Sequence, residues 1–329
     1  MSVIRNLQSR SLTSPGHTRP RCASKRSTRV KRPLRRRHVL TWRSSLPGRN
    51  AEHECEGCDL VNIQIPGDQV QLIQAVAAKS KKTVVVLFGG GAMDVSAFVD
   101  SVDAILFAHY PGQEGGAAIA DVLAGKINPS GELATTWPRR LEDAATWAHF
   151  PARPDSDGAV TLSLVEGLEV GYRRDWSQVA DGQQYLFGFG LSYASFSWEN
   201  LALHPNTLRF TEGAAEMSVK PTLANTWPVA GSEVVQVYVA PSSKNGSSDT
   251  SLSMHPMRAL KGLKKVALEA GESKEIEIIL DAKSALSYWD TTNSKWRIEK
   301  VQYTFSIGNG VNALSHDLTV AEDQEWLHL

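Results

Sequence analysis

The sequence predicts a parallel α/β layer followed by an all-β sandwich. Two apolar runs, 84–88 and 104–108, have the length and the β-branched content of strands that are buried on both faces. A helical pattern and glycine-rich turns surround these runs, as expected for a parallel layer. Beyond about residue 197, short alternating runs separated by turns replace the helical patterns. The change of pattern indicates two domains of different class.

Two helices are expected in the first domain. The first fits residues 69–79, where Val70, Ile73 and Val76 make an apolar stripe and Asp68 fits the N-cap position. The second fits 117–124, because its apolar residues lie on one side and Gly125 follows as a stop signal.

Shorter connections complete the predicted layer. Residues 94–99 leave room for a short helical or irregular crossover, and 133–137 reads as another short strand after the turn at 128–131. Ligands of parallel sheets usually lie outside the carboxyl ends of the strands. The glycines at 89–91 and the loop 111–116 are expected at that edge.

Four runs predict strands of the second domain, and turns that contain glycine separate them. A serine- and asparagine-rich insert at 241–256 predicts a mobile surface loop. The predicted strands are Val234–Val239, Val266–Leu268, Ile276–Leu280 and Tyr303–Ile307.

The chain has 329 residues and no net formal charge, but its charges are unevenly distributed. Residues 1–50 hold 14 Lys and Arg and no Asp or Glu, which leaves 21 basic and 35 acidic residues in the remainder. A basic, proline-interrupted segment with few periodic apolar residues cannot bury enough surface to fold alone. We therefore expect residues 1–49 to be a disordered leader.

Three interpretations of this leader compete. It is rich in Arg and Ser like a mitochondrial transit peptide, although it is only weakly amphipathic. The cluster at 31–37 suits a nucleic-acid-binding arm, since arginines neutralise phosphates. The third interpretation, which we favour, is that it is sequence unrelated to the domain that follows.

No apolar run approaches the roughly 18–20 residues of a transmembrane helix, and no signal-peptide core is recognisable. We therefore expect no membrane partner, and the localisation stays open.

Several segments resemble a known family. The stretch YPGQEGGAAIADVLAGKINPSGELATTWP, at 110–138, is similar to the C-terminal α/β-sandwich domain of glycoside hydrolase family three, which contains most β-glucosidases and β-xylosidases. The segments 166–173 and 186–193 also look like this family. SEVVQVYVAP and LSYWD resemble its fibronectin-type-III-like domain, an immunoglobulin-like sandwich.

The resemblance assigns domains at 50–195 and 196–322, with a tail at 323–329. Family members are often secreted, and they carry the catalytic nucleophile on an N-terminal (β/α)₈ barrel. A barrel needs roughly 250 residues, which the stretch before residue 48 does not offer. The first strands of the α/β domain are also expected to be missing. The chain therefore looks like the C-terminal half of an enzyme.

The resemblance also points to an acidic motif at 52–59. It implies that Glu56 is the general acid/base, with Glu54 as the second candidate. An extended backbone would place the carboxylates of Glu52, Glu54 and Glu56 on one side, where crowding raises a carboxyl pKa. The family commonly has aromatic residues where His53 and Cys58 stand, and Arg where Leu60 stands. Because of these differences, the substrate contacts stay open.

No cofactor or metal is predicted. The pair Cys55-x-x-Cys58 lacks the second pair of ligands that a zinc site needs, and its context is not that of a redox motif. The expected partner is a β-glucoside or oligosaccharide substrate, with no nucleic acid; the oligomeric state stays open.

The predicted function is that of a retaining β-glucosidase, inactive as this chain alone. The alternative is a non-catalytic carbohydrate-binding or interaction remnant of such an enzyme.

Overall fold

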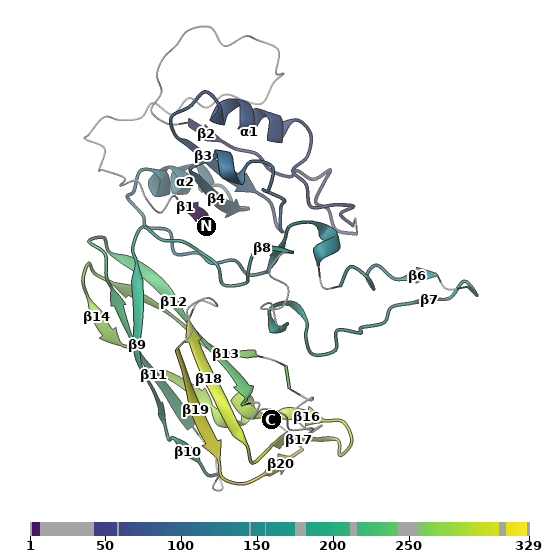
Figure 1. Cartoon of the computed structure of the whole chain (residues 1–329), viewed down its shortest axis with the longest axis vertical. Helices are drawn as coiled ribbons and strands as arrows, with labels where there is room; N and C mark the ends of the chain where they lie inside the picture. Colours follow the sequence, from purple (N-terminus) through teal and green to yellow (C-terminus); the bar gives the residue numbers. More distant parts are fainter. Residues whose placement is uncertain are drawn as a thin grey trace.

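The computed structural model has two stacked parts, an α/β layer and a β-sandwich, as the sequence predicts (Figure 1). It describes residues 2–6, 43–57, 59–144, 146–154, 156–174, 182–210, 216–242, 255–256, 258–308 and 314–327.

The α/β layer is built on a four-stranded sheet in the order β1-β4-β3-β2. The strands β2, β3 and β4 are parallel, and β1 runs antiparallel to β4. The two predicted buried strands are confirmed as the centre of this sheet. The strands are β1 (Ser2–Asn6), β2 (Arg43–Ser45), β3 (Thr83–Phe88) and β4 (Ala104–His109).

A helix covers each face of this sheet. Side chains alternate between faces along a strand, so β3 and β4 supply two separate apolar clusters. Val85 packs in one cluster with Ile73 of α1 (Gln69–Ala77), and Val86 packs in the other with Ile119 of α2 (Gly115–Leu123). Both predicted helices are confirmed. Asp68 occupies the N-cap of α1, but its side chain forms no capping hydrogen bond.

The crossover between the strands is short, as expected, and includes the 3₁₀ turn η1 (Val99–Ser101). The prediction of a strand over 133–137 is wrong for most of its length. Only β5 (Trp137–Pro138) forms, and it pairs antiparallel with β8 (Gln183–Tyr185) outside the parallel sheet. The physical reason is burial, because Leu133 and Trp137 pack on the α1 side of the sheet. Backbone groups of residues 133 and 139 form their hydrogen bonds with the segment 182–189, which returns past them.

The expectation of a disordered leader over 1–49 is wrong for the two segments that the structure describes there. β1 pairs with β4, and β2 pairs with β3. The α/β layer thus includes residues 43–49, and β2 supplies one of the strands that we expected to be missing. The remaining leader residues, 1 and 7–42, lie outside the described residues.

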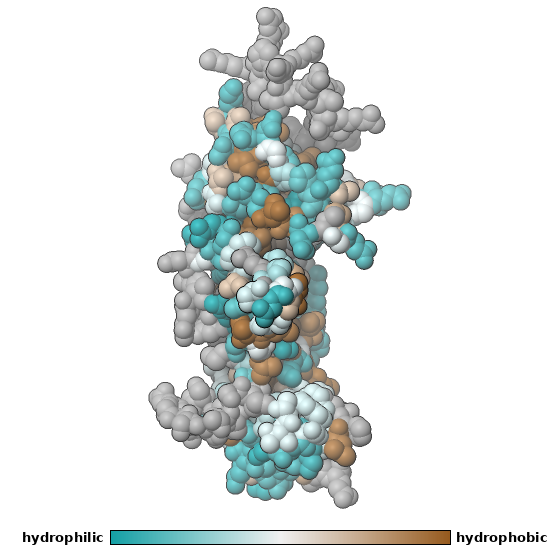
Figure 2. Space-filling view, turned by 90° about the vertical axis from the view of Figure 1, so that its right-hand side faces the viewer, coloured by the Kyte–Doolittle hydropathy of each residue, from teal (hydrophilic) through white to brown (hydrophobic). Residues whose placement is uncertain are grey.

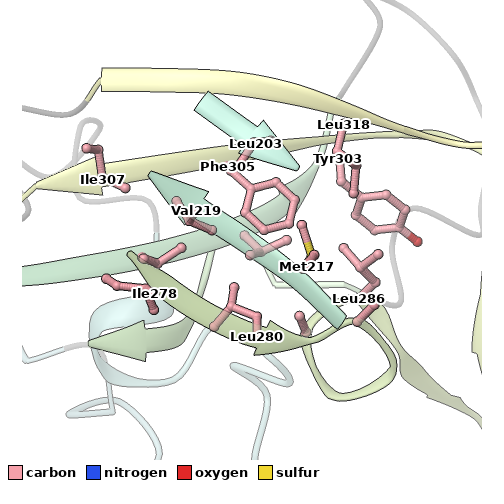
Figure 3. Packing of buried hydrophobic residues seen from close by; sticks show 14 of the residues in the cluster. Leu203, Met217, Val219, Ile278, Leu280, Leu286, Tyr303, Phe305, Ile307 and Leu318 are labelled. Atoms are coloured by element: carbon pink, nitrogen blue, oxygen red, sulfur yellow. The ribbon is translucent and has the colours of Figure 1, made fainter. Parts of the chain in front are cut away.

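The β-sandwich packs two main sheets against each other around one apolar core (Figure 3). One sheet has the order β10-β19-β18-β12-β13, and the other has β14-β11-β15 with β9 on β11. Each of the four predicted strands corresponds to a strand of these sheets, although the prediction over 276–280 begins two residues before the observed strand. The strands are β9 (Phe196–His204), β10 (Thr207–Leu208), β11 (Glu216–Asn225), β12 (Gly231–Pro241), β13 (Ala259–Leu268), β14 (Ser273–Glu275), β15 (Ile278–Asp281), β18 (Gln302–Gly308) and β19 (Leu314–Val320).

A short helix and a small third sheet close one end of the sandwich. The helix α3 (Ala282–Leu286) begins at Asp281, whose carboxylate accepts the Ser284 N–H. The sheet β16-β17-β20 includes part of the expected tail 323–329, since β20 pairs with β17. Most of the insert predicted as a mobile loop, 243–254, lies outside the described residues. The strands are β16 (Tyr288–Asp290), β17 (Lys295–Ile298) and β20 (Gln324–Trp326).

An extended arm projects from the α/β layer (Figure 1). Its hairpin consists of β6 (Arg153–Pro154) and β7 (Val160–Thr161), and the 3₁₀ turns η2 (Leu141–Asp143) and η3 (Gly171–Arg173) lie at its two roots. The sequence between 139 and 154 has no regular pattern, and the structure accordingly contains little regular backbone there.

Side-chain hydrogen bonds join the two parts. The Asn128 amide accepts from the backbone N–H of Tyr193 at 2.8 Å and donates to the Ala230 carbonyl at 2.9 Å. Gly231 follows directly, and a Cβ there would lie 2.8 Å from the Asn128 side chain. The Asn-Pro-Ser-Gly turn at 128–131 is thus hydrogen-bonded to the residue that precedes β12.

No helix among the described residues is long and apolar enough to cross a membrane.

Candidate functional site

The acidic motif lies beside the carboxyl end of β3. The backbone of Arg49 donates to the Phe88 carbonyl at 3.0 Å, and the Phe88 N–H donates to the Pro47 carbonyl at the same distance. Through these bonds, residues 47–49, which follow β2, pair with Phe88, the last residue of β3. The acidic residues then follow directly, next to the glycines at 89–91.

The backbone of the motif is turned rather than extended. The N–H groups of His53 and Glu54 both donate to the Asn50 carbonyl at 2.9 Å. The expectation of an extended segment with three carboxylates on one side is therefore wrong. A turn replaces the two-residue alternation of a strand, so Glu54 and Glu56 have different surroundings.

Glu54 is held by three donors from three segments. Its Oε1 accepts from Arg49 Nη1 at 2.9 Å, and its Oε2 accepts from the Gly90 N–H at 2.8 Å and from the Tyr110 hydroxyl. The Arg49 side chain is only 1% exposed, and its second Nη donates to the Ala92 carbonyl at 2.9 Å. This arrangement ties the turn to the ends of both central strands.

These contacts keep Glu54 ionised. Burial alone would raise the pKa of Glu54, but hydrogen bonds from Tyr110, Gly90 and Arg49 together hold it below its usual value. The raised carboxyl pKa that we expected from crowding is thus wrong for this residue. Both carboxylate oxygens of Glu54 are occupied by donors from the protein, so this residue is held as an anchor and is not presented to a substrate.

Glu56, the predicted acid/base, is placed differently. It is exposed, and within the described part of the chain it forms no hydrogen bond or ion pair. Gly57 follows with φ +77°, a left-handed conformation that glycine adopts without strain. The turn therefore presents Glu56 at the surface while its neighbour Glu54 is fixed.

The other residues of the motif are accessible as well. His53 is exposed, with its Nδ1 2.6 Å from Asn50 Oδ1, and Leu60 is half-buried. Cys55 is disulfide-bonded and so is not available as a thiolate ligand. No cluster of metal-binding side chains occurs among the described residues, and Cys58 lies outside them.

The sequence alone did not reveal Arg49, Gly90 and Tyr110 as partners of Glu54. Arg49 stands at the end of the basic leader, and nothing local distinguishes it from the other arginines. Its burial arises from the loop after β3, which is distant in sequence. The glycines at 89–91 were a usable signal, since a backbone N–H at the end of a strand is free to bind a carboxylate.

Replacing Glu54 with Gln is expected to destabilise the α/β layer by about 1–3 kcal/mol at pH 7. The folded pKa of Glu54 is lowered, so its contribution is present at neutral pH and is lost as the pH falls through that folded value. The difference between wild type and variant should therefore shrink in acid. Urea unfolding between pH 3 and pH 7 measures it. Glu52→Gln, at an exposed position two residues earlier, is the control and should behave like wild type. An unchanged stability of Glu54→Gln at pH 7 would contradict the anchoring role.

Comparison with known proteins agrees with this fold. Residues 41–193 match the model of the glycosyl hydrolase family 3 C-terminal domain, and residues 233–311 match that of a fibronectin type III-like domain. An exo-α-(1→6)-L-arabinopyranosidase of Bifidobacterium breve is 35% identical over 82% of this chain and 33% of its own length. A probable β-glucosidase I of Aspergillus terreus is 33% identical over 86% of this chain and 32% of its own length.

Solved structures show the same relationship. A β-glucosidase from Kluyveromyces marxianus in complex with glucose superposes with a TM-score of 0.73 at 30% identity, covering 87% of this chain and 32% of its own. A family 3 β-glucosidase of Bifidobacterium adolescentis gives 0.70 at 35% identity, with 84% and 38% covered. The chain spans about a third of the length of the curated relatives that it matches. It carries both the C-terminal α/β domain and the fibronectin-like domain, and it belongs to glycosyl hydrolase family 3.

Proposed function

We propose that this chain supplies the acid/base half of a retaining β-glucosidase, with Glu56 as the acid/base. The observation that carries the proposal is the contrast between two carboxylates in one turn. Glu54 is bound by three donors and has a lowered pKa, whereas Glu56 is exposed and forms no hydrogen bond or ion pair within the described chain. Of the two, Glu56 is the one that is free to exchange a proton with a substrate.

The chemistry needs a second carboxylate. In a retaining reaction one carboxyl group protonates the glycosidic oxygen while another, about 5–5.5 Å away, attacks the anomeric carbon. The first group then takes a proton from the water that hydrolyses the covalent intermediate. Glu52 and Glu54 lie in the same turn as Glu56 and cannot face it across a sugar ring. We therefore infer that the nucleophile belongs to another polypeptide segment, such as the portion of the longer relatives that this chain does not span.

The names of the relatives support a glycoside substrate. Those compared above include β-glucosidases, one of them solved with glucose, and an arabinopyranosidase. We infer a terminal β-D-glucoside as the substrate.

The purified chain 1–329 alone is expected to release no measurable nitrophenol from p-nitrophenyl β-D-glucoside, because protonation without a nucleophile does not complete the reaction. Adding the N-terminal portion of a family relative as a separate polypeptide should produce turnover. Glu56→Gln should then lower kcat by about 10²–10⁴-fold. The loss should be smaller with a dinitrophenyl glucoside, whose leaving group needs little protonation.

Glu52→Gln is the matched control and should retain turnover. Turnover by the wild-type chain alone that is lost in Glu56→Gln would show that both carboxylates are present here. Complemented turnover that is unaffected by Glu56→Gln would refute the role of that residue. Failure of complementation would favour the non-catalytic alternative.

A further inference from the structure

Three tryptophans form a row across the small sheet at the end of the β-sandwich. Trp289 of β16 lies directly opposite Trp296 of β17, and Trp296 lies directly opposite Trp326 of β20. Directly paired residues of an antiparallel sheet project their side chains from the same face. The three indole rings therefore share one face of this sheet, and they are called the tryptophan row below.

The row is packed at its inner end and open at its outer end. Trp326 packs against the core of the sandwich, and Lys283 Nζ lies 5.0 Å from the centre of its ring. The rings of Trp289 and Trp296 meet edge to face, with their centres 5.6 Å apart and an angle of 70° between their planes. Such a contact restricts both rings. Trp289 nevertheless stays 41% exposed, so the row presents an ordered aromatic surface to solvent.

The turn of the same hairpin offers hydroxyl groups. The Asp290 carboxylate accepts from the Thr292 N–H at 2.9 Å and from the Asn293 side-chain amide at 2.8 Å, which holds the turn in one shape. The side chains of Thr291, Thr292 and Ser294 are exposed, and within the described chain their hydroxyls form no hydrogen bond. An aromatic surface with a few polar groups beside it is the usual composition of a small-ligand site.

The charged side chains of this small sheet are paired with one another or with a neighbour. Lys295 Nζ lies 3.2 Å from a Glu325 carboxylate oxygen. Nitrogens of Arg297 lie 3.8 Å from carboxylate oxygens of Asp290 and of Asp323. Opposite charges at these separations largely cancel each other's field at longer range. The surface therefore suits an uncharged ligand better than a polyanion or a polycation.

The surroundings of the row are polar rather than aliphatic. Figure 1 shows the three-stranded sheet at the end of the sandwich that is far from the α/β layer, with the turn of the β16–β17 hairpin pointing to the right. Figure 2 views that side, and pale and teal residues dominate the lower end of the molecule. Large apolar patches are typical of protein-binding surfaces. A single exposed aromatic face in a polar surface fits a ligand that has an apolar face and polar edges.

We propose that Trp289 and the turn 291–294 form a binding site for a neutral chain of β-linked glucose. A β-D-glucose ring carries only C–H groups on its two faces and hydroxyls around its edge. The C–H groups suit the electron-rich face of an indole, and the hydroxyls suit the threonine and serine side chains of the turn. The choice of β-linked glucose rests on the proposed function, whereas the surface itself is independent of it.

A purely structural role explains only part of the row. Cross-strand aromatic pairs stabilise a hairpin, and the packing of Trp326 on the core has this effect. Packing gives no reason for the outermost member, Trp289, to expose two-fifths of its surface. A row that only stabilises the sheet is therefore an outcome that would overturn the proposal.

The test titrates cellohexaose into the full chain by isothermal titration calorimetry. Trp289→Ala removes the exposed ring, and Trp289→Phe keeps an aromatic face together with the contact to Trp296. Trp227→Ala is the matched control, because Trp227 is 52% exposed but lies in the loop between β11 and β12. Hexagalacturonate, which has the same number of rings but is anionic, is the comparison ligand.

Wild type and Trp227→Ala are expected to bind cellohexaose equally, Trp289→Ala at least about 10-fold more weakly, and Trp289→Phe in between. Wild type should bind hexagalacturonate at least about 10-fold more weakly than cellohexaose, because the paired charges do not attract an anion. No binding by wild type, equal binding by Trp289→Ala, or equal affinity for the two oligosaccharides would overturn the proposal.

A measurement on the wild-type chain covers the case in which Trp289→Ala disturbs the hairpin. Hydroxyl-radical footprinting with peptide mass spectrometry reports the exposure of each tryptophan. Cellohexaose should lower the oxidation of Trp289 several-fold and leave that of Trp227 unchanged. Unchanged oxidation of Trp289 at a saturating concentration would place the ligand elsewhere and reject the site.

The outcomes separate this inference from the proposed function. Binding that depends on Trp289, without turnover in the complemented assay, keeps the glucan site and rejects the acid/base assignment. Turnover that depends on Glu56, without binding at Trp289, keeps the assignment and rejects the glucan site.

Discussion

Replacing Phe305 with alanine is expected to lower the free energy of unfolding of the β-sandwich by about 3–5 kcal/mol. Phe305 is fully buried on β18, and Figure 3 shows its ring among aliphatic side chains between the two sheets. Leu203 and Val219, from the facing sheet, are fully buried as well. The loss combines the transfer of the ring out of water with the cavity that it leaves, because closely packed sheets collapse only partly.

Urea unfolding followed by tryptophan fluorescence measures this loss. The control is Ile279→Ala on β15, where the side chain is 62% exposed; it should change stability by no more than about 0.5 kcal/mol. A loss below about 1 kcal/mol for Phe305→Ala would mean that the two sheets do not enclose this ring in solution.

The second large effect is a loss of stability between pH 5 and pH 8.5 that depends on Glu132. This residue follows the Asn-Pro-Ser-Gly turn of the α/β layer, and its carboxyl faces Glu233 of β12. Glu132 Oε2 also accepts from the Gln236 amide, whose oxygen accepts from the Tyr238 hydroxyl. Arg258 adds a positive charge beside Tyr238, since its guanidinium carbon lies 5.2 Å from the centre of the Tyr238 ring.

We expect the two carboxyl groups to hold one proton between them in the folded state at neutral pH. Burial, with Glu233 as hydrogen-bond partner and like charge, raises the pKa of Glu132 to about 8. Burial also raises the pKa of Glu233. Because the folded pKa lies above the unfolded value, the folded state binds more protons in between. The stabilisation is complete below about pH 4.5 and is lost as the pH rises through about 8.

We expect the loss to be about 2–4 kcal/mol, since each pKa unit corresponds to about 1.4 kcal/mol and the partly exposed groups are screened by solvent. Glu132→Gln removes the titrating proton and should flatten the dependence. Glu275→Gln, an exposed carboxylate on β14, should keep the wild-type dependence. Urea unfolding at several pH values decides the matter; a wild-type slope in Glu132→Gln would contradict the shared proton.

This window is separate from that of Glu54. The lowered pKa of Glu54 affects stability only in acid, whereas the raised pKa of Glu132 acts up to about pH 8. The stability contributions of these two carboxyl groups thus depend on pH with opposite signs, because Glu54 is bound by donors whereas Glu132 is largely buried and faces a second carboxyl group.

Hydrophobic periodicity in the sequence was enough to predict the central strands, both helices and the change to a β-sandwich. The runs at 84–88 and 104–108 are apolar at every position. A strand needs such a run only when both of its faces are covered, as both faces of these strands are here. The acidic motif and the family followed from residues close together in the chain. Such features are local, so a single sequence contains them.

The tertiary structure decided which polar groups meet. The edge strand β2 is short and polar, and it is defined by its pairing with β3, which is distant in the sequence. The strand β5 pairs with β8 outside the parallel sheet, and its Trp137 is buried. The fixing of Glu54 depends on Gly90 and Tyr110, which are 36 and 56 residues away, and Glu132 meets Gln236 across 104. A periodic pattern shows which side of an element is buried, but it carries no information about the partner of a buried charge. Folding brings those distant segments together, and with them it separates the ionised Glu54 from the exposed Glu56.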